Sequence, residues 1–173
     1  MSQVTEKTII IKDFTGIQEE RIANAEIYPG HLIEVMSTDK VRVHATEGGN
    51  ALPIFAIENE LEGQGIGDAY AAADIVQFRY FRTGDIVLGI LADGESIAIG
   101  DPLISAGDGT VKEWAAVTES FEIEGSSGEA IEVTLGNPLS IIGYAEEALD
   151  LSGSSGEESS GISTRPRLKI RIR

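Results

Sequence analysis

The chain has 173 residues, enough for one ordinary domain with a substantial core. Its 29 acidic and 13 basic residues leave a formal charge of −16, which argues against an autonomous nucleic-acid-binding protein, because phosphate neutralisation needs a basic surface. Hydrophobic residues make up 42% of the chain, so the acidity indicates the surface of a folded domain rather than disorder, and the absence of cysteine excludes disulfides and thiolate zinc sites.

Residues 1–25 contain one short apolar run and then polar sequence with few turn signals. Three isoleucines are too few for a signal-peptide core, and no run in the chain has the length of a membrane-spanning helix. We therefore expect a soluble protein whose residues 1–25 form an extended arm that docks on a neighbour, with residues 2–16 making the contact. The candidate contact residues in this arm are Thr8, Ile9, Ile10, Ile11 and Phe14.

From residue 26 onward, turn signals rich in Gly, Asp and Asn recur about every ten residues. Between them lie short runs of β-branched and aromatic residues, several with a period of two, as in residues 32–36 and 75–80. This pattern predicts an all-β fold over residues 26–173, a small β-barrel or β-sandwich with little helix. Only residues 18–25 and 68–73 carry weak helical patterns, and residues 85–99 are expected to form a hairpin about Ala92-Asp93-Gly94.

The aromatic residues are most concentrated at Phe78-Arg79-Tyr80-Phe81-Arg82. On a strand, alternate residues point to opposite faces, so this segment places aromatic groups on both faces. Two interpretations stay open: one face belongs to an interface anchored by arginine, or both faces are covered within the monomer. The candidate interface residues here are Phe78, Tyr80, Phe81 and Arg82.

A weak internal repeat has a spacing of 70 positions. Residues 27–30 lead to a tight turn and a Val-basic pair at 37–42, and residues 97–100 lead to a similar turn and pair at 107–112. Residues 55–58 and 144–147 end the two units in a similar way. The repeat indicates either two related halves or the reuse of a common hairpin in a β-barrel.

The C-terminal part of the body begins with a Gly/Ser/Glu loop at residues 152–163, which has no apolar residues suited to a core until its end. Residues 165–173 then carry five of the 13 basic residues, so residues 1–164 have 8 basic and 29 acidic residues, a charge of −21. Because apolar and basic residues alternate, we interpret this segment as a strand that completes the sheet rather than as a nucleic-acid-binding tail. Its candidate contact residues are Arg167, Lys169 and Arg171.

Catalytic patterns are absent. His31 and His44 lack a partner set that defines a metal centre, and the glycine-rich residues 63–67 do not follow the spacing of a phosphate-binding loop. We expect no catalytic residue, no cofactor, no metal and no membrane partner.

The order and spacing of several segments resemble the capsid decoration, or cement, proteins of tailed bacteriophages. The segments are 27–34, 44–50, 55–58, 66–77, 84–87, 91–103, 107–111, 142–153 and the basic terminal strand. The resemblance implies a β-barrel protein, commonly trimeric, on the outer surface of a viral head made in the host cytoplasm. It also implies a structural role, in which the protein clamps neighbouring subunits of the major capsid protein without catalysis.

Two other classes of function remain as alternatives. A virion-surface or extracellular adhesion module that recognises a glycan or host surface would need an aromatic platform or a groove, and Trp114 is the only tryptophan. A β-barrel hydrolase would need His31 or His44 beside a converging carboxylate.

Overall fold

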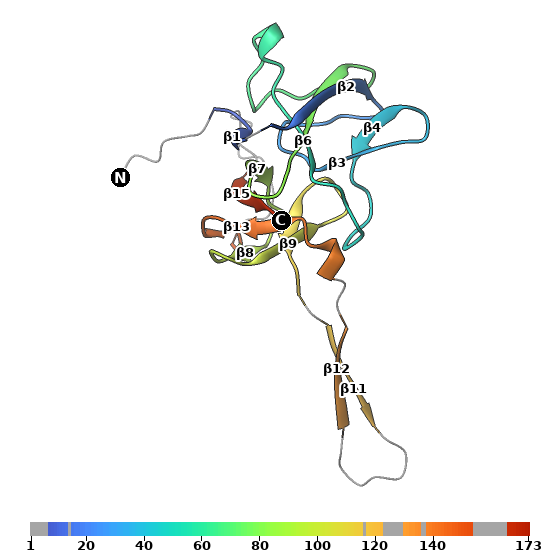
Figure 1. The fold of residues 1–173 in the computed structure, drawn as a ribbon, viewed down its shortest axis with the longest axis vertical. Helices are drawn as coiled ribbons and strands as arrows, with labels where there is room; N and C mark the ends of the chain where they lie inside the picture. Colours follow the sequence, from blue (N-terminus) through green and yellow to red (C-terminus); the bar gives the residue numbers. More distant parts are fainter. Residues whose placement is uncertain (1–6, 14, 116, 123–129, 136–137, 154–165) are drawn as a thin grey trace, which may run out of the picture.

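The computed structural model describes residues 7–13, 15–115, 117–122, 130–135, 138–153 and 166–173. Within these residues the chain forms 15 strands and two single-turn 3-10 helices, η1 (Glu60–Glu62) and η2 (Pro138–Ser140). The predicted all-β class is confirmed (Figure 1).

Two sheets form the body of the molecule. The first has the order β3-β4-β2-β6-β5, and its strands are β2 (Ile17–Ala23), β3 (Ile33–Val35), β4 (Lys40–Val43), β5 (Ile54–Ala56) and β6 (Ile75–Tyr80). The second has the order β1-β7-β15-β13-β9-β10, and its strands are β1 (Ile10–Lys12), β7 (Ile86–Ile90), β9 (Pro102–Ser105), β10 (Val111–Glu113), β13 (Gly143–Ala145) and β15 (Arg167–Ile172). Two smaller pairs are β8 (Ser96–Ile97) with β14 (Leu149–Asp150), and β11 (Val117–Glu122) with β12 (Ala130–Leu135).

Each of the two sheets curls until its ends meet. In the first, an antiparallel bridge joins Leu32, just before β3, to Phe55 in β5. In the second, a parallel bridge joins Leu91, just after β7, to Val111 in β10. We call the first closed unit barrel 1 (β2 to β6) and the second barrel 2 (β7, β9, β10, β13 and β15), with β1 paired to the outer edge of β7.

The two barrels have the same topology. Strands β2, β3, β4, β5 and β6 of barrel 1 correspond to β7, β9, β10, β13 and β15 of barrel 2. The connecting hydrogen bonds recur as well: Gly30 N–H donates to Ala56 O at 2.8 Å, and Gly100 N–H donates to Ala145 O at 2.9 Å.

Other bonds repeat in the same way, which fixes the equivalence residue by residue. In each bond the N–H of the first residue donates to the carbonyl oxygen of the second. The bond from Asn24 to Val41 in barrel 1 matches that from Ala92 to Val111 in barrel 2, and Ala23 to Asp74 matches Leu91 to Pro166. Likewise His44 to Leu32 matches Trp114 to Pro102, and Ile57 to Gln77 matches Glu146 to Lys169. The repeat predicted at a spacing of 70 is therefore confirmed, and the chain consists of two related halves. The β11–β12 hairpin is an insertion in the second half, between β10 and β13.

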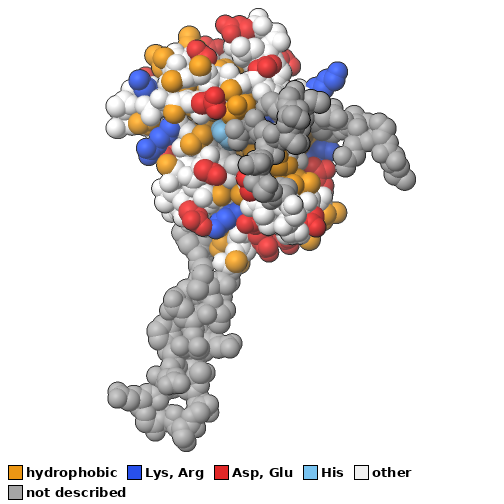
Figure 2. Space-filling view, turned by 180° about the vertical axis from the view of Figure 1, so that it is seen from behind, with side chains coloured by type: hydrophobic (Ala, Val, Ile, Leu, Met, Phe, Trp, Pro, Cys, Tyr) orange, Lys and Arg blue, Asp and Glu red, His pale blue; other side chains and the backbone are white. Residues whose placement is uncertain are grey.

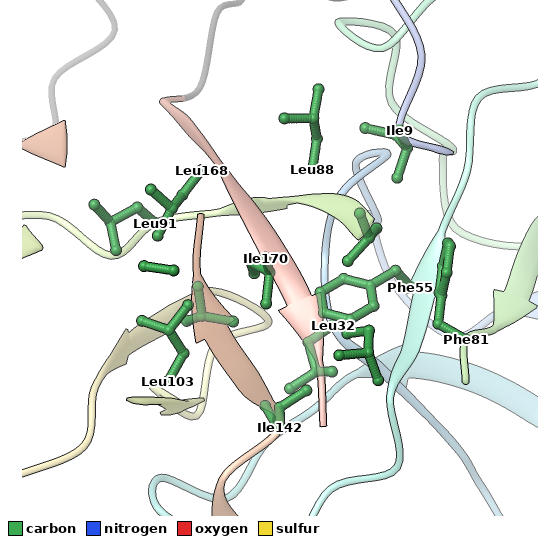
Figure 3. Close-up of a cluster of buried hydrophobic side chains, with 14 of the residues drawn as sticks. Ile9, Leu32, Phe55, Phe81, Leu88, Leu91, Leu103, Ile142, Leu168 and Ile170 are labelled. Atoms are coloured by element: carbon green, nitrogen blue, oxygen red, sulfur yellow. The ribbon is translucent and has the colours of Figure 1, made fainter. Parts of the chain in front are cut away.

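Each barrel contains its own apolar cluster, because alternate strand residues face inward. The cluster of barrel 1 includes Ile33, Val41 and Phe78, and that of barrel 2 includes Leu103, Val111 and Ile170 at the equivalent positions. The larger cluster of barrel 2 also takes in groups from barrel 1 and from the N-terminal segment (Figure 3); these are Ile9, Leu32, Phe55, Ile57 and Phe81. The larger cluster thus joins the two halves, and the cluster of barrel 1 remains separate from it.

Three local predictions were wrong. Residues 18–25 are not helical, because β2 hydrogen-bonds to β6 on one side and to β4 on the other. Residues 68–73 form turns around the bridge from Ile27 to Tyr70. The turn at Gly94 exists, but β7 pairs with β1 and β15 whereas β8 pairs with β14, so residues 85–99 do not form a hairpin.

Candidate interaction surfaces

The basic C-terminal strand lies inside the second sheet, between β7 and β13. Its residues Leu168, Ile170 and Ile172 are buried, so the predicted sheet-completing strand is confirmed. The cations on its other face are paired within the chain: Arg171 with Glu146, and Lys169 Nζ with Glu147 Oε2 at 3.7 Å.

The ion pair between Arg171 and Glu146 on this outer face changes the pKa of both groups. The hydrogen bond from Arg171 lowers the pKa of Glu146, and the same bond raises the pKa of Arg171. Both groups are largely in contact with water, so this pair contributes little to stability by itself. Tyr144 of β13 stands directly beside Arg171 in the register of the sheet.

Arg167 has a different role, because it connects the two halves. Its guanidinium donates to the carbonyl oxygen of Pro29 at 3.0 Å and to that of Ile66. The side chain is half-buried, and its target carbonyls belong to barrel 1. A predicted contact residue is thus engaged at the junction inside the monomer.

The described part of the predicted arm, residues 7–13 and 15–25, lies within the sheets of its own chain. Ile9 is fully buried; its N–H donates to Glu58 Oε2 at 3.0 Å and its carbonyl accepts from Leu88 N–H at 2.9 Å. Ile10 and Ile11 are half-buried against the same core, and Thr8 is half-buried as well. Phe14 lies outside the described residues.

The aromatic segment 78–82 is mostly covered within the monomer. Phe78 and Phe81 are buried, Tyr80 is half-buried, and the ring of Phe81 meets the ring of Phe55 edge-on at 5.9 Å. Arg82 is exposed, and its guanidinium donates to Thr15 Oγ1 at 3.0 Å. Of this segment, Arg82 and the edge of Tyr80 remain available to a partner.

The β11–β12 hairpin extends away from both barrels (Figure 1). Its antiparallel register runs from Val117 opposite Leu135 to Glu122 opposite Ala130. Nothing in the sequence indicated that these two strands leave the body.

Large apolar residues are also exposed on the body of the molecule, among the acidic groups seen in Figure 2. Within the described residues they are Ile17, Ile22, Val35, Leu52, Leu61, Ile75, Ile99, Leu139 and Tyr144. Only the tertiary structure distinguishes these from the apolar residues of the core, and sequence reasoning selected none of them.

Both histidines contact groups of their own chain, and His44 Nε2 lies 3.9 Å from Glu34 Oε2. His44 is buried, with its Nδ1 2.8 Å from Ser105 Oγ of barrel 2, and His31 Nδ1 accepts the N–H of Tyr28 at 3.2 Å. Among the described residues, no group of three or more His, Cys, Asp or Glu is arranged to hold a metal ion. The described part of the chain also has no helix of the length and hydropathy that crossing a bilayer requires.

The fold and these surfaces define a class: an all-β protein of two duplicated, closed barrels with a projecting hairpin and exposed apolar residues. Among solved structures, the chain is similar to the crystal structure of the head fiber gp8.5 N base in bacteriophage phi29, with a TM-score of 0.52. The match covers 92% of this chain and 95% of that chain at 14% sequence identity, so it shows likeness of fold. No family model and no curated protein matches the sequence.

Proposed function

We propose that this protein is a structural, non-enzymatic component of a tailed-phage virion. In this proposal it binds the outer surface of the head, contacts neighbouring subunits of the major capsid protein and self-associates as a homotrimer. The observation that carries the proposal is the similarity of nearly the whole chain to the base of a phage head fibre. The resemblance of its sequence segments to capsid decoration proteins supports the same conclusion independently.

The energetics of attachment follow from mass action. A protein that binds the assembled shell, but not its separated subunits, stabilises the shell by an amount that grows with its free concentration. Many copies on one particle add their contributions, so each contact need not be strong.

We propose the N-terminal segment as the part that contacts the capsid. β1 is the edge strand of the six-stranded sheet, and an edge strand offers main-chain groups that extend the sheet of a partner. Because Ile9 is buried and bonded to Glu58, the segment from Ile9 onward also anchors the arm to the body. Residues 2–7 are therefore the segment to remove when attachment is tested without disturbing the core.

Co-sedimentation with purified heads of its phage tests the proposal. The full chain is expected to sediment with the heads and to raise the temperature at which they release their DNA. Deletion of residues 2–7 is expected to weaken binding by about tenfold or more while the unfolding midpoint of the free protein stays unchanged. Deletion of residues 155–160, six residues of the Gly/Ser/Glu loop, is the matched control and should bind normally.

The outcomes separate the parts of the proposal. Failure of the full chain to bind heads would overturn the attachment function. Normal binding by the 2–7 deletion would exclude residues 2–7 from the capsid contact and leave β1 or another part of the molecule to make it.

A further inference from the structure

The duplication of the barrels shows how one barrel packs on another, because the two halves meet in a well-defined junction. From barrel 1, the junction uses Pro29, Gly30, His44 and Phe55; from barrel 2, it uses Gly89, Ile90, Ser105 and Arg167. Four contacts define it: Ile90 N–H with Gly30 O at 3.1 Å, Arg167 with the Pro29 carbonyl at 3.0 Å, His44 with Ser105 at 2.8 Å, and the Phe55 ring over Gly89.

Each junction position has an equivalent in the other barrel, and most of these equivalent positions are exposed. The exceptions are Trp114 and Arg21, which are half-buried, and Arg21 pairs with Glu19 and Asp39 of its own chain. On barrel 1, the positions of Ile90, Arg167, Ser105 and Gly89 are occupied by Ile22, Ile75, Val35 and Arg21, which we call face A. On barrel 2, the positions of Pro29, Gly30, His44 and Phe55 are occupied by Ile99, Gly100, Trp114 and Tyr144, which we call face B.

The exposed apolar residues gather at these two faces. Of the nine large apolar residues exposed in the described chain, five lie on them: Ile22, Val35 and Ile75 on face A, and Ile99 and Tyr144 on face B. At equivalent positions, Ile90 in the junction is 2% exposed whereas Ile22 on face A is 46% exposed, and Phe55 in the junction is 0% exposed whereas Tyr144 on face B is 39% exposed. Exposed apolar patches on an otherwise acidic protein mark interaction sites, so we expect another molecule to cover faces A and B.

The residues of face A also complement those of face B. Where the intramolecular junction pairs Arg167 with the Pro29 carbonyl, the equivalent contact brings Ile75 to Ile99. Where it pairs Ser105 with His44, the equivalent contact brings Val35 to Trp114. The two polar contacts of the intramolecular junction thus correspond to two apolar contacts between faces A and B. In each of these contacts both partners are apolar.

The remaining two contacts are compatible as well. Gly100 has the same left-handed conformation as Gly30, with a φ of 92° in both, and so leaves room for Ile22 as Gly30 leaves room for Ile90. In the junction the Phe55 ring packs on Gly89. Arg21 occupies the position equivalent to Gly89, and Tyr144 the position equivalent to Phe55. Tyr144 would therefore pack on the guanidinium of Arg21, an arrangement favoured by cation–π attraction.

We propose that face A of one copy of this chain packs on face B of the next, reproducing the junction inside each monomer. The occupant of each face is therefore a second copy, because the junction inside this chain shows a barrel surface that matches each face. Such a contact is heterologous, joining different surfaces of the two copies, and it closes into a ring or grows into a filament. This inference rests on the self-association proposed above: in a trimer, three such contacts alternate with three intramolecular junctions.

Thiol cross-linking tests the contact directly, because the chain has no cysteine of its own. Ile75→Cys and Ile99→Cys variants are mixed and treated with a short bifunctional maleimide, and a cross-linked dimer is expected from the mixture but from neither variant alone. Ile17→Cys is the control. Ile17 also lies on a strand and is 54% exposed, but it does not correspond to a junction residue, so Ile17→Cys should give no product with Ile99→Cys. A chain carrying both cysteines should yield products that stop at the closed ring.

A charge variant gives a second readout. Ile75→Asp places an unpaired charge in the contact, and self-association measured by sedimentation velocity should weaken by about tenfold or more. Because Ile75 is exposed in the monomer, the unfolding midpoint of this variant should equal that of the wild type at concentrations at which both are monomeric.

The experiment is run both in solution and on heads carrying the bound variants. Cross-linking of Ile75→Cys with itself would indicate a symmetric contact and overturn the inference. Absence of the mixed product in both settings would overturn it too. Head binding without cross-linking contradicts only this inference, whereas cross-linked rings that fail to bind heads contradict only the proposed attachment function.

Discussion

At the scale of single residues, Tyr70 shows how a polar group is accommodated in the core of barrel 1. Its ring is buried, its O–H donates to the carbonyl oxygen of Ile57 at 2.7 Å, and its backbone forms the bridge to Ile27. Burial, together with the nearby charge of Glu58, raises the pKa of Tyr70 from 10.0 to about 12. The phenol is therefore held neutral by its surroundings.

This raised pKa predicts a loss of stability in alkali. Below pH 10 the phenol is neutral in both states; above it the unfolded chain ionises first, so stability falls between pH 10 and about 12. The slope is at most about 1.4 kcal/mol per pH unit. Tyr70→Phe should remove this component and cost about 1–2 kcal/mol at neutral pH, since the Ile57 carbonyl loses its donor.

Urea denaturation between pH 7 and pH 11 measures both effects. Tyr144→Phe, on an exposed tyrosine, is the control and should follow the wild type. An identical alkaline decline for wild type and Tyr70→Phe would contradict the assigned role of the buried phenol.

At the scale of elements, β15 shows how one strand serves both the core and the surface. Its apolar residues fill barrel 2, and its cations face carboxylates on the outside. The strand was recognised from sequence because its alternation is strict and its length suits a strand. Its position in the middle of the sheet was not, since sequence alternation does not identify the neighbours of a strand.

The two faces of β15 should differ in their energetic weight. Ile170→Ala removes a fully buried side chain and should lower the free energy of unfolding by about 2–5 kcal/mol. Arg171→Ala breaks a surface ion pair and should lower the free energy of unfolding far less than Ile170→Ala does. Because Arg171 lowers the pKa of Glu146, this small contribution exists above the unfolded pKa of the carboxyl and vanishes as the pH falls through the lowered one.

Urea titrations at neutral and acidic pH give these values. Equal losses for Ile170→Ala and Arg171→Ala would show that the strand is not part of the core.

At the scale of the whole molecule, the two halves are joined by main-chain bonds as well as by packing. Leu32 N–H donates to Gly109 O at 2.8 Å, and Gly48 N–H donates to Ser105 O at 2.9 Å. Phe55, Leu32 and Phe81 of the first half lie in the same cluster as Ile142 and Ile170 of the second (Figure 3). The larger cluster therefore depends on residues of both barrels, whereas the smaller cluster is built from residues of barrel 1 alone.

This shared core predicts a single cooperative unfolding transition. Trp114, the only tryptophan, reports on barrel 2, whereas far-ultraviolet circular dichroism reports on both barrels. The two signals should change together in urea, and Phe55→Ala should shift both by the same amount, about 3–5 kcal/mol. Two separated transitions would show that the halves fold independently.

Several features of the fold were predictable from local sequence. The turn signals, the alternation of 75–80 and 167–172, and the repeat at a spacing of 70 depend on neighbouring residues alone, and the structure agrees with each. The pattern over residues 18–25 was misread as helix because its glutamates and alanines favour helices, whereas pairing with β4 and β6 made it a strand. The expected hairpin at 85–99 was wrong because long-range pairing gave each strand another partner.

By itself, the sequence determined the all-β class, the acidic surface, the lack of thiol chemistry and the alternation of the terminal strand, and it offered the duplicated plan as one of two interpretations of a repeat. These follow from composition and from periodicities of a few residues. The tertiary structure alone decided that the N-terminal segment docks on β7 through the bond between Ile9 and Leu88, that one apolar cluster spans two closed barrels, and that Ile22, Ile75, Ile99 and Tyr144 remain uncovered. Burial of an apolar residue depends on partners distant along the chain, and for that reason isoleucines of the core and isoleucines of the exposed faces look alike in sequence.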